Sequence, residues 1–263
     1  MARQTQYQQG PRWEGVRLNV AMIGNFLSAE AKSAIDIGCN EGFIACALTE
    51  LGAKCKGFEA NPVFLETANR LKETFGRGTV FQNKIVSMDD LKGMEPVDVS
   101  LLLSVHHQIA ANSSLDHANE FLRMLASKTR MQFFFQPACI ADKYGEAKPP
   151  FAENDYAAIK EYFDGVLASA GMTHSTFIGF SINDMPTSEP LRPMYVYSRE
   201  PIGWRHSAKV DDLLHRLRDA RDLVNPPAPK ATKVAKPATV TQPPSVRPKE
   251  KRRKTLLQRV LGR

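Results

Sequence analysis

The sequence of 263 residues predicts an α/β fold, a doubly wound, mostly parallel sheet of seven strands with an antiparallel last strand. Three observations lead to this prediction. Short apolar runs alternate with amphipathic segments up to about residue 170. One run, 97–105, is apolar almost throughout, as expected for a central strand covered on both faces. Two final apolar runs follow one another without a helix between them, which indicates an antiparallel edge.

The first half of the chain supplies most of the parallel sheet. Residues 1–15 are polar and rich in glutamine and predict a loose arm, whereas apolar spacings of three and four predict a covering helix over 16–30. Parallel strands are predicted at 33–37, 55–59, 79–83, 97–105 and 131–136. Helices are predicted at 43–51, 62–75 and 114–127. Pro62 suits the first turn of its helix, and Gly52 suits the end of the helix before it.

The second half completes one domain. A long loop is predicted over 137–153, then a helix over 154–170 and two strands at 176–180 and 194–197, joined by 181–193. Apolar residues in register predict a further helix over 207–224. We therefore predict four parts: 1–30, an arm with a covering helix; 31–200, the α/β domain; 201–224, a helical segment; and 225–263, a tail.

The tail carries the basic character of the chain. Residues 230–263 hold eleven lysines and arginines against one acid, Glu250, so this segment carries +10 and the remainder carries −3 of a net charge of +7. Residues 225–249 are rich in Pro, Ala, Lys and Thr and predict disorder. The last residues, 251–263, predict a short basic amphipathic helix. Any argument for nucleic-acid binding from net charge therefore applies to the tail alone.

Composition also indicates a compartment. No apolar stretch reaches the roughly 20 residues that span a bilayer, and residues 1–10 lack the apolar core of an export signal. The four cysteines show no metal-ligand spacing and are interpreted as reduced, small core side chains. We expect a cytoplasmic protein without a bound metal.

A glycine turn follows the first strand. Asp36, Gly38 and Gly42 form the pattern Asp-x-Gly-x-x-x-Gly, and Glu59 ends the second strand about twenty residues further on. Glycines allow the backbone to approach a ligand, and an acid at this position can accept the hydroxyls of a ribose. The turn lacks the middle glycine of the dinucleotide fingerprint, and no phosphate-binding Gly-Lys-Ser/Thr occurs. A nucleoside cofactor that carries an amino group instead of phosphates would suit Asp36.

These residues resemble the class I S-adenosylmethionine-dependent methyltransferases. The family motif after strand one is matched by Asp36, Gly38 and Gly42, and its acid after strand two is matched by Glu59. Its fourth-strand motif is echoed in 96–107. The resemblance covers about residues 30–200 and implies S-adenosylmethionine as the cofactor.

The resemblance also implies a set of cofactor-binding positions. They lie in the turn after strand one and behind strands two, three and four: Asp36, Gly38, Cys39, Asn40, Gly42, Glu59, Ala60, Asn61, Lys84, Ile85 and Ser104. Many family members have an acid after strand three, near the adenine amino group. This chain has Lys84 and Ile85 there, a departure from the pattern that concerns the adenine contacts.

Two histidines are the candidates for catalysis. His106 and His107 follow the fourth strand at the edge where the cofactor would bind. A histidine titrates near neutrality and can remove a proton from a hydroxyl acceptor. Capping or packing is the alternative role for each of them, because the methyl transfer itself needs chiefly the right placement of the acceptor.

The sequence therefore predicts a methyltransferase that acts on an oxygen of a small molecule or glycan. An RNA methyltransferase that uses the tail for phosphate contacts, and a non-catalytic scaffold with this fold, are the alternatives. Residues 249–263 can contact a protein partner or the anionic inner face of a membrane, which would make the protein peripheral there. No aromatic residues interleave the basic ones, which favours these contacts over RNA.

Overall fold

The computed structural model describes residues 11–181, 191–204 and 207–224. The strands are β1 (Ser33–Ile37), β2 (Lys54–Glu59), β3 (Val80–Asn83), β4 (Val97–Leu103), β5 (Thr129–Gln136), β6 (His174–Ser181) and β7 (Arg192–Ser198). The helices are α1 (Pro11–Phe26), α2 (Phe43–Glu50), α3 (Pro62–Thr74), α4 (Met88–Lys92), α5 (His106–Asn112), α6 (Leu115–Ser127), α7 (Tyr156–Ala168) and α8 (Ala208–Val224), with a 3₁₀ turn η1 (Ala141–Tyr144).

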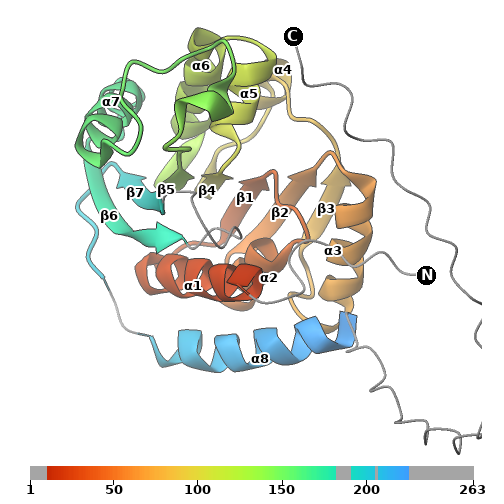
Figure 1. Cartoon of the computed structure of the whole chain (residues 1–263). Coiled ribbons are helices and arrows are strands. Elements are labelled where there is room, and N and C mark those ends of the chain that lie inside the picture. Colours follow the sequence, from red (N-terminus) through yellow and green to blue (C-terminus); the bar gives the residue numbers. More distant parts are fainter. Residues whose placement is uncertain (1–10, 182–190, 205–206, 225–263) are drawn as a thin grey trace, which may run out of the picture. The chain divides into compact units, whose positions relative to one another are not determined.

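All seven strands form one sheet in the order β3-β2-β1-β4-β5-β7-β6 (Figure 1). The five strands β1 to β5 pair in parallel, and β7 pairs antiparallel with both β5 and β6. The predicted fold class is therefore confirmed. The strand order reverses between β1 and β4, which is the place where open α/β sheets bind their ligands.

Helices cover both faces of the sheet (Figure 1). On one face, α6 and α7 pack their apolar residues on Ile35, Ile37 and Phe135. On the other, α1 and α2 pack on Ala34 and Phe134. The helix α8 lies against α1, α2 and α3 and adds an outer layer on that second face. The alternating direction of side chains along each strand thus gives one apolar cluster on each face of the sheet, and residues of α8 and the helices beneath it form a third.

Several predicted boundaries need correction. The covering helix begins at Pro11, within the stretch predicted as a loose arm, and ends at Phe26. The helix starts this early because Trp13 is buried against Phe43, with ring centroids 5.4 Å apart. The strand predicted over 97–105 ends at Leu103, and the short helices α4 and α5 were not predicted at all.

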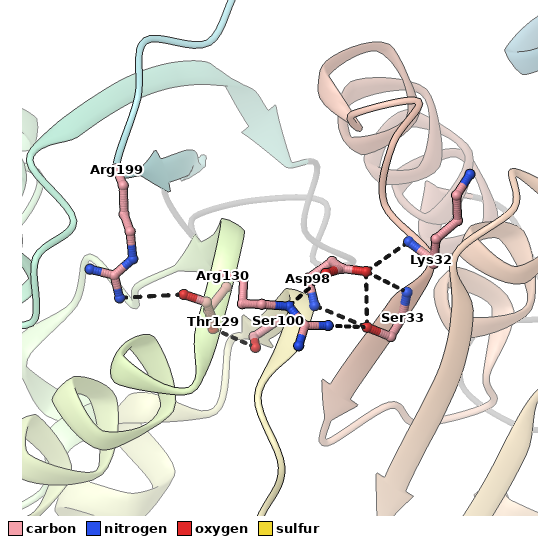
Figure 2. Close-up of polar contacts among 7 residues, drawn as sticks. All are labelled: Lys32, Ser33, Asp98, Ser100, Thr129, Arg130 and Arg199. Atoms are coloured by element: carbon pink, nitrogen blue, oxygen red, sulfur yellow. Dashed lines mark hydrogen bonds and ion pairs between the residues drawn. The ribbon is translucent and has the colours of Figure 1, made fainter.

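A polar network joins the amino ends of β1, β4 and β5 (Figure 2). The Asp98 carboxylate accepts hydrogen bonds from the backbone N–H groups of Lys32 (2.8 Å) and Ser33 (3.0 Å). The Ser33 hydroxyl (3.0 Å) and the Arg130 Nε (2.8 Å) donate to the same carboxylate. This network fixes the start of three central strands, at the edge of the sheet opposite to the glycine turn.

All described residues belong to one compact unit, Met1–Pro226, which is separate from Pro227–Arg263. The predicted tail and its basic helix lie outside the described residues. Within the described part of the chain, no helix is both long enough and apolar enough to cross a membrane.

Candidate functional site

The site lies where the parallel strands end. The carboxyl ends of β1, β2 and β4 bring together the turn 38–42, Glu59 and Ser104, because neighbouring parallel strands end at the same edge. The backbone N–H groups of Gly38 and Cys39 donate to the Phe58 carbonyl, at 2.8 and 3.0 Å. These two bonds tie the turn to β2 and hold it beside Glu59.

The glycines of the turn are required by its shape. Gly38 and Gly42 have φ angles of 74° and 78°, in the region that side chains rarely adopt. A Cβ on Gly38 would lie 2.5 Å from Val105, and one on Gly42 would lie 2.5 Å from Phe81. Asn40, between them, also has a positive φ of 51°. The turn therefore keeps a tight backbone path that only these residue types allow.

Glu59 bridges two loops at the end of β2. Its carboxylate accepts hydrogen bonds from the backbone N–H of Asn40 at 2.9 Å and of Asn61 at 2.8 Å. The Asn61 side chain accepts from the N–H of Val63 and begins α3, while Ala60 is exposed beside it. The structure thus brings Glu59 next to the glycine turn, as the sequence predicted.

Asp36 is a buried carboxylate beside this group. Its side chain is 3% exposed, and no described residue donates a hydrogen bond to it. Burial, together with the negative charge of Glu59, raises the pKa of Asp36 to about 7. A buried acid without a partner, next to a second acid, is an arrangement that a bound cation would stabilise.

The positions after β3 are arranged differently. The backbone N–H of Lys84 donates to the Glu59 carbonyl at 3.1 Å, and its ammonium pairs with Asp90 at 2.5 Å. The hydrogen bond from Lys84, with those from Ser87, lowers the pKa of Asp90 to about 2. Ile85 is 80% exposed. The acid of this region, Asp90, is therefore paired with Lys84. The exposed Ile85 offers an apolar surface close to Glu59.

The two histidines open α5 and face away from solvent. His106 has no exposed surface and lies among Phe135, Tyr144 and Phe163. Its Nε2 lies 3.2 Å from the Asn119 Oδ1, and burial lowers the pKa of His106 to about 4. A neutral, enclosed imidazole suits packing, and this conformation gives it no route to an acceptor. His107 is 7% exposed and packs on Tyr144 with ring centroids 6.0 Å apart.

Ser104 directly follows β4, and Gln136 ends the neighbouring strand β5. Ser104 has a positive φ of 58°, which is uncommon for a serine and often marks functional positions. Its hydroxyl donates to the Gln136 Oε1 at 2.5 Å, and its N–H donates to the Gln136 carbonyl at 2.9 Å. Gln136 was not among the predicted site residues. The available signal was a polar residue directly after the apolar run 133–135, at the end of a strand.

The cysteines of this region are core residues. Cys39, Cys46 and Cys55 are free thiols with at most 7% of their surface exposed. Burial raises the pKa of each, for Cys46 to about 12. Thiols in this state are weak nucleophiles, in agreement with their interpretation as small packing side chains.

Comparison with known proteins finds a resemblance at the level of structure. No family model matches the sequence, and no curated protein matches it. The bifunctional kinase-methyltransferase WbdD aligns with a TM-score of 0.54 and 20% identity, over 72% of this chain and 42% of WbdD. Magnesium protoporphyrin IX methyltransferase (ChlM) from Synechocystis PCC 6803, solved with bound SAM, aligns at 0.52 and 16% identity, over 75% of this chain and 86% of that one.

These similarities define the fold class. The chain has the Rossmann-like fold of the class I S-adenosylmethionine-dependent methyltransferases. It spans less than half of WbdD, so the activities of that longer protein do not transfer with the fold. A fold of this kind hosts many reactions, and the reaction must be argued from the site.

Proposed function

We propose that the protein is an S-adenosylmethionine-dependent methyltransferase that methylates an oxygen of a small molecule or glycan. The observation that carries the proposal is the buried Asp36 carboxylate, to which no described residue donates a hydrogen bond, beside Glu59 and the glycine turn. S-adenosylmethionine, when bound, supplies a methyl group activated by a sulfonium charge. Its fold relative ChlM was solved with SAM and with SAH, which supports the choice of cofactor.

The residues present fit such a cofactor. Two acids at the ends of β1 and β2 disfavour a pyrophosphate and favour a ligand with positive charge. Gly38 and Gly42 keep the turn in a backbone path that a Cβ would block, by contact with Val105 and Phe81. Glu59 would accept the ribose hydroxyls, and Asp36 would face the charged amino-acid end. Ile85 would contact the base through its exposed apolar side chain.

Glu59 gives the direct test of cofactor binding. We expect Glu59→Ala to weaken S-adenosylhomocysteine binding by at least about 100-fold, because charge-assisted hydrogen bonds to both hydroxyls are lost. Isothermal titration calorimetry measures this, with the exposed Glu66→Ala on α3 as the control. Unchanged affinity in Glu59→Ala would refute the assigned site. Failure of the unmodified protein to bind the compound would favour the non-catalytic scaffold.

The histidines are tested separately from cofactor binding. A general base is identified by a turnover that falls in His107→Ala or His106→Ala while S-adenosylhomocysteine affinity stays the same. The geometry favours His107 of the two, since His106 is enclosed by aromatic rings. Unchanged turnover in both variants would remove the histidines from the mechanism.

A further inference from the structure

Four side chains share one face of the sheet at its carboxyl edge. Asp36 and Glu59 lie two and four residues after Ala34 and Cys55, so they belong to the same face as these two members of the apolar cluster under α1 and α2. Gln136 and Arg192 are each two residues from Phe134 and Met194, which belong to the same cluster. Because β7 runs antiparallel to β5, its first residue, Arg192, lies at the edge where β5 ends.

The charges along this edge change sign from one end to the other. The sheet order places β2 and β1, with their two acids, on one side of β4 and places β5 and β7 on the other. Arg192 brings positive charge to the segment that follows β5. Its charge partly offsets the burial that raises the pKa of Cys139 to about 12. The acids therefore face the cofactor side, and the cation faces the side left for the acceptor.

Gln136 adds an unused donor on the acceptor side. The residue is 4% exposed, and its Nε2 has no hydrogen-bond partner among the described residues. The Ser104 hydroxyl donates a hydrogen bond to the Gln136 Oε1. The amide nitrogen is therefore the end of the side chain that remains available to a ligand. A buried donor without a partner is unfavourable, and a bound acceptor atom removes this cost.

From these placements we infer that the methyl acceptor is an anionic oxygen, of a carboxylate or a phosphate monoester, bound by the Gln136 amide and the Arg192 guanidinium. The inference rests on the proposed function and names its substrate class. An anionic oxygen forms the new C–O bond as the C–S bond of the sulfonium breaks, and the electron pair leaves with sulfur. No proton is moved, so the reaction needs no general base, in agreement with the enclosed His106.

The test compares matched acceptors on the full-length protein saturated with S-adenosylhomocysteine. Carboxylic acids are paired with their primary alcohols, and sugar monophosphates with the same neutral sugars. We expect calorimetry to show anionic members binding at least about tenfold more tightly than their neutral partners. Transfer of labelled methyl from S-adenosylmethionine should follow the same order, and the two arms separate a carboxylate from a phosphate.

Variants then assign the effect to these residues. Gln136→Glu keeps the acceptor for Ser104 but replaces the donor with a negative charge, so the dissociation constant of the anionic probe should rise at least about tenfold. Arg192→Met should act in the same direction, and Arg192→Lys should restore part of the affinity. Arg123→Met, an exposed arginine on α6, is the control for loss of one charge. Affinity for S-adenosylhomocysteine should stay within about twofold in all four.

The outcomes separate the inference from the proposed function. If the unmodified protein does not bind S-adenosylhomocysteine, the proposed function is contradicted. If that compound binds and neutral alcohols or sugars bind as well as the anions, the inference is overturned and the proposed function stands. The same holds if no anionic acceptor binds, or if Gln136→Glu leaves the affinity for anions unchanged.

Discussion

At the scale of single residues, the glycine turn predicts a measurable loss of stability when a side chain is added to it. Gly42→Ala adds a Cβ 2.5 Å from Phe81 and 2.8 Å from Ala68, at a positive φ of 78°. We expect a loss of about 2–4 kcal/mol in the free energy of unfolding and weaker S-adenosylhomocysteine binding. Urea unfolding and calorimetry measure the two effects.

Gly52 is the matched control for this substitution. It also has a positive φ, 108°, but a Cβ there would meet nothing within 4 Å. Gly52→Ala should therefore cost only the backbone conformation, about 1–2 kcal/mol, and leave ligand binding unchanged. Equal losses of stability in the two variants would contradict the steric explanation.

Two buried titratable residues should give opposite pH dependences of stability. The folded-state pKa of His106 is lowered to about 4 from 6.5, so its contribution is present above pH 6.5 and is lost as pH falls toward 4. The pKa of Asp36 is raised to about 7 from 3.8, so stability is lost as pH rises between these values. In the shared window the two slopes oppose each other, each by about 1.4 kcal/mol per pH unit.

The variants Asp36→Asn and His106→Gln separate these slopes. Between pH 4.5 and 6.5, the free energy of unfolding should rise more steeply with pH in Asp36→Asn than in the unmodified protein. It should rise less steeply, or fall, in His106→Gln. Urea titrations at several pH values measure both, and parallel curves for the three proteins would show that neither group is linked to folding as described.

At the scale of elements, the sequence predicted best where local patterns and packing agree. The run 97–105 predicted a central strand, but the strand ends at Leu103 because Ser104 takes a positive φ and His106 begins α5. The sequence of α5 has no helical spacing of apolar residues. The aromatic rings that its histidines contact come from residues distant in sequence. Other errors were avoidable, since Ser87 and Asp90 form a capping box at α4 and Pro11 suits a helix start.

In the candidate site, too, residues specified by a local pattern were predictable and residues placed by distant packing were not. The glycine turn and Glu59 were predictable because a local motif specifies them. Gln136 and Arg192 were not, because their common face arises only from the pairing of β5 with β7 across a long separation in sequence. His106 shows the limit of a local pattern, since its position in the sequence suggests the site while its side chain lies in the aromatic core.

The network around Asp98 gives a prediction for the strands it joins. Asp98→Ala removes four hydrogen bonds from β1, its preceding residue and Arg130 (Figure 2). Burial would raise the pKa of this carboxyl, but these bonds outweigh it and lower the pKa. We expect a loss of about 2–4 kcal/mol, because two backbone donors lose their partner.

An exposed acid serves as the control for this loss. Asp89 pairs with Lys92 at 2.9 Å on the surface of α4, where the Asp89 side chain is 89% exposed. Asp89→Ala should leave the urea midpoint unchanged. Similar midpoints for the Asp98 and Asp89 variants would show that the network does not hold the strand ends together.

At the scale of the whole molecule, the charge is divided between two parts of the chain. Residues 230–263 carry +10, and the remainder carries −3. The compact unit Met1–Pro226 contains all the residues assigned to the site. An anionic acceptor at that site and an anionic surface at the tail would therefore be recognised by separate groups of basic residues.

Removal of the tail tests this separation. We expect a chain ending at Pro226 to keep the thermal stability and the S-adenosylhomocysteine affinity of the full-length protein, because the site lies within the remaining unit. The full-length protein should bind vesicles that contain anionic lipid, more weakly as salt rises, whereas the shortened protein should not. Vesicle flotation measures this, with neutral vesicles as the control. RNA binding that disappears with the tail while the vesicles remain unbound would instead support the RNA methyltransferase.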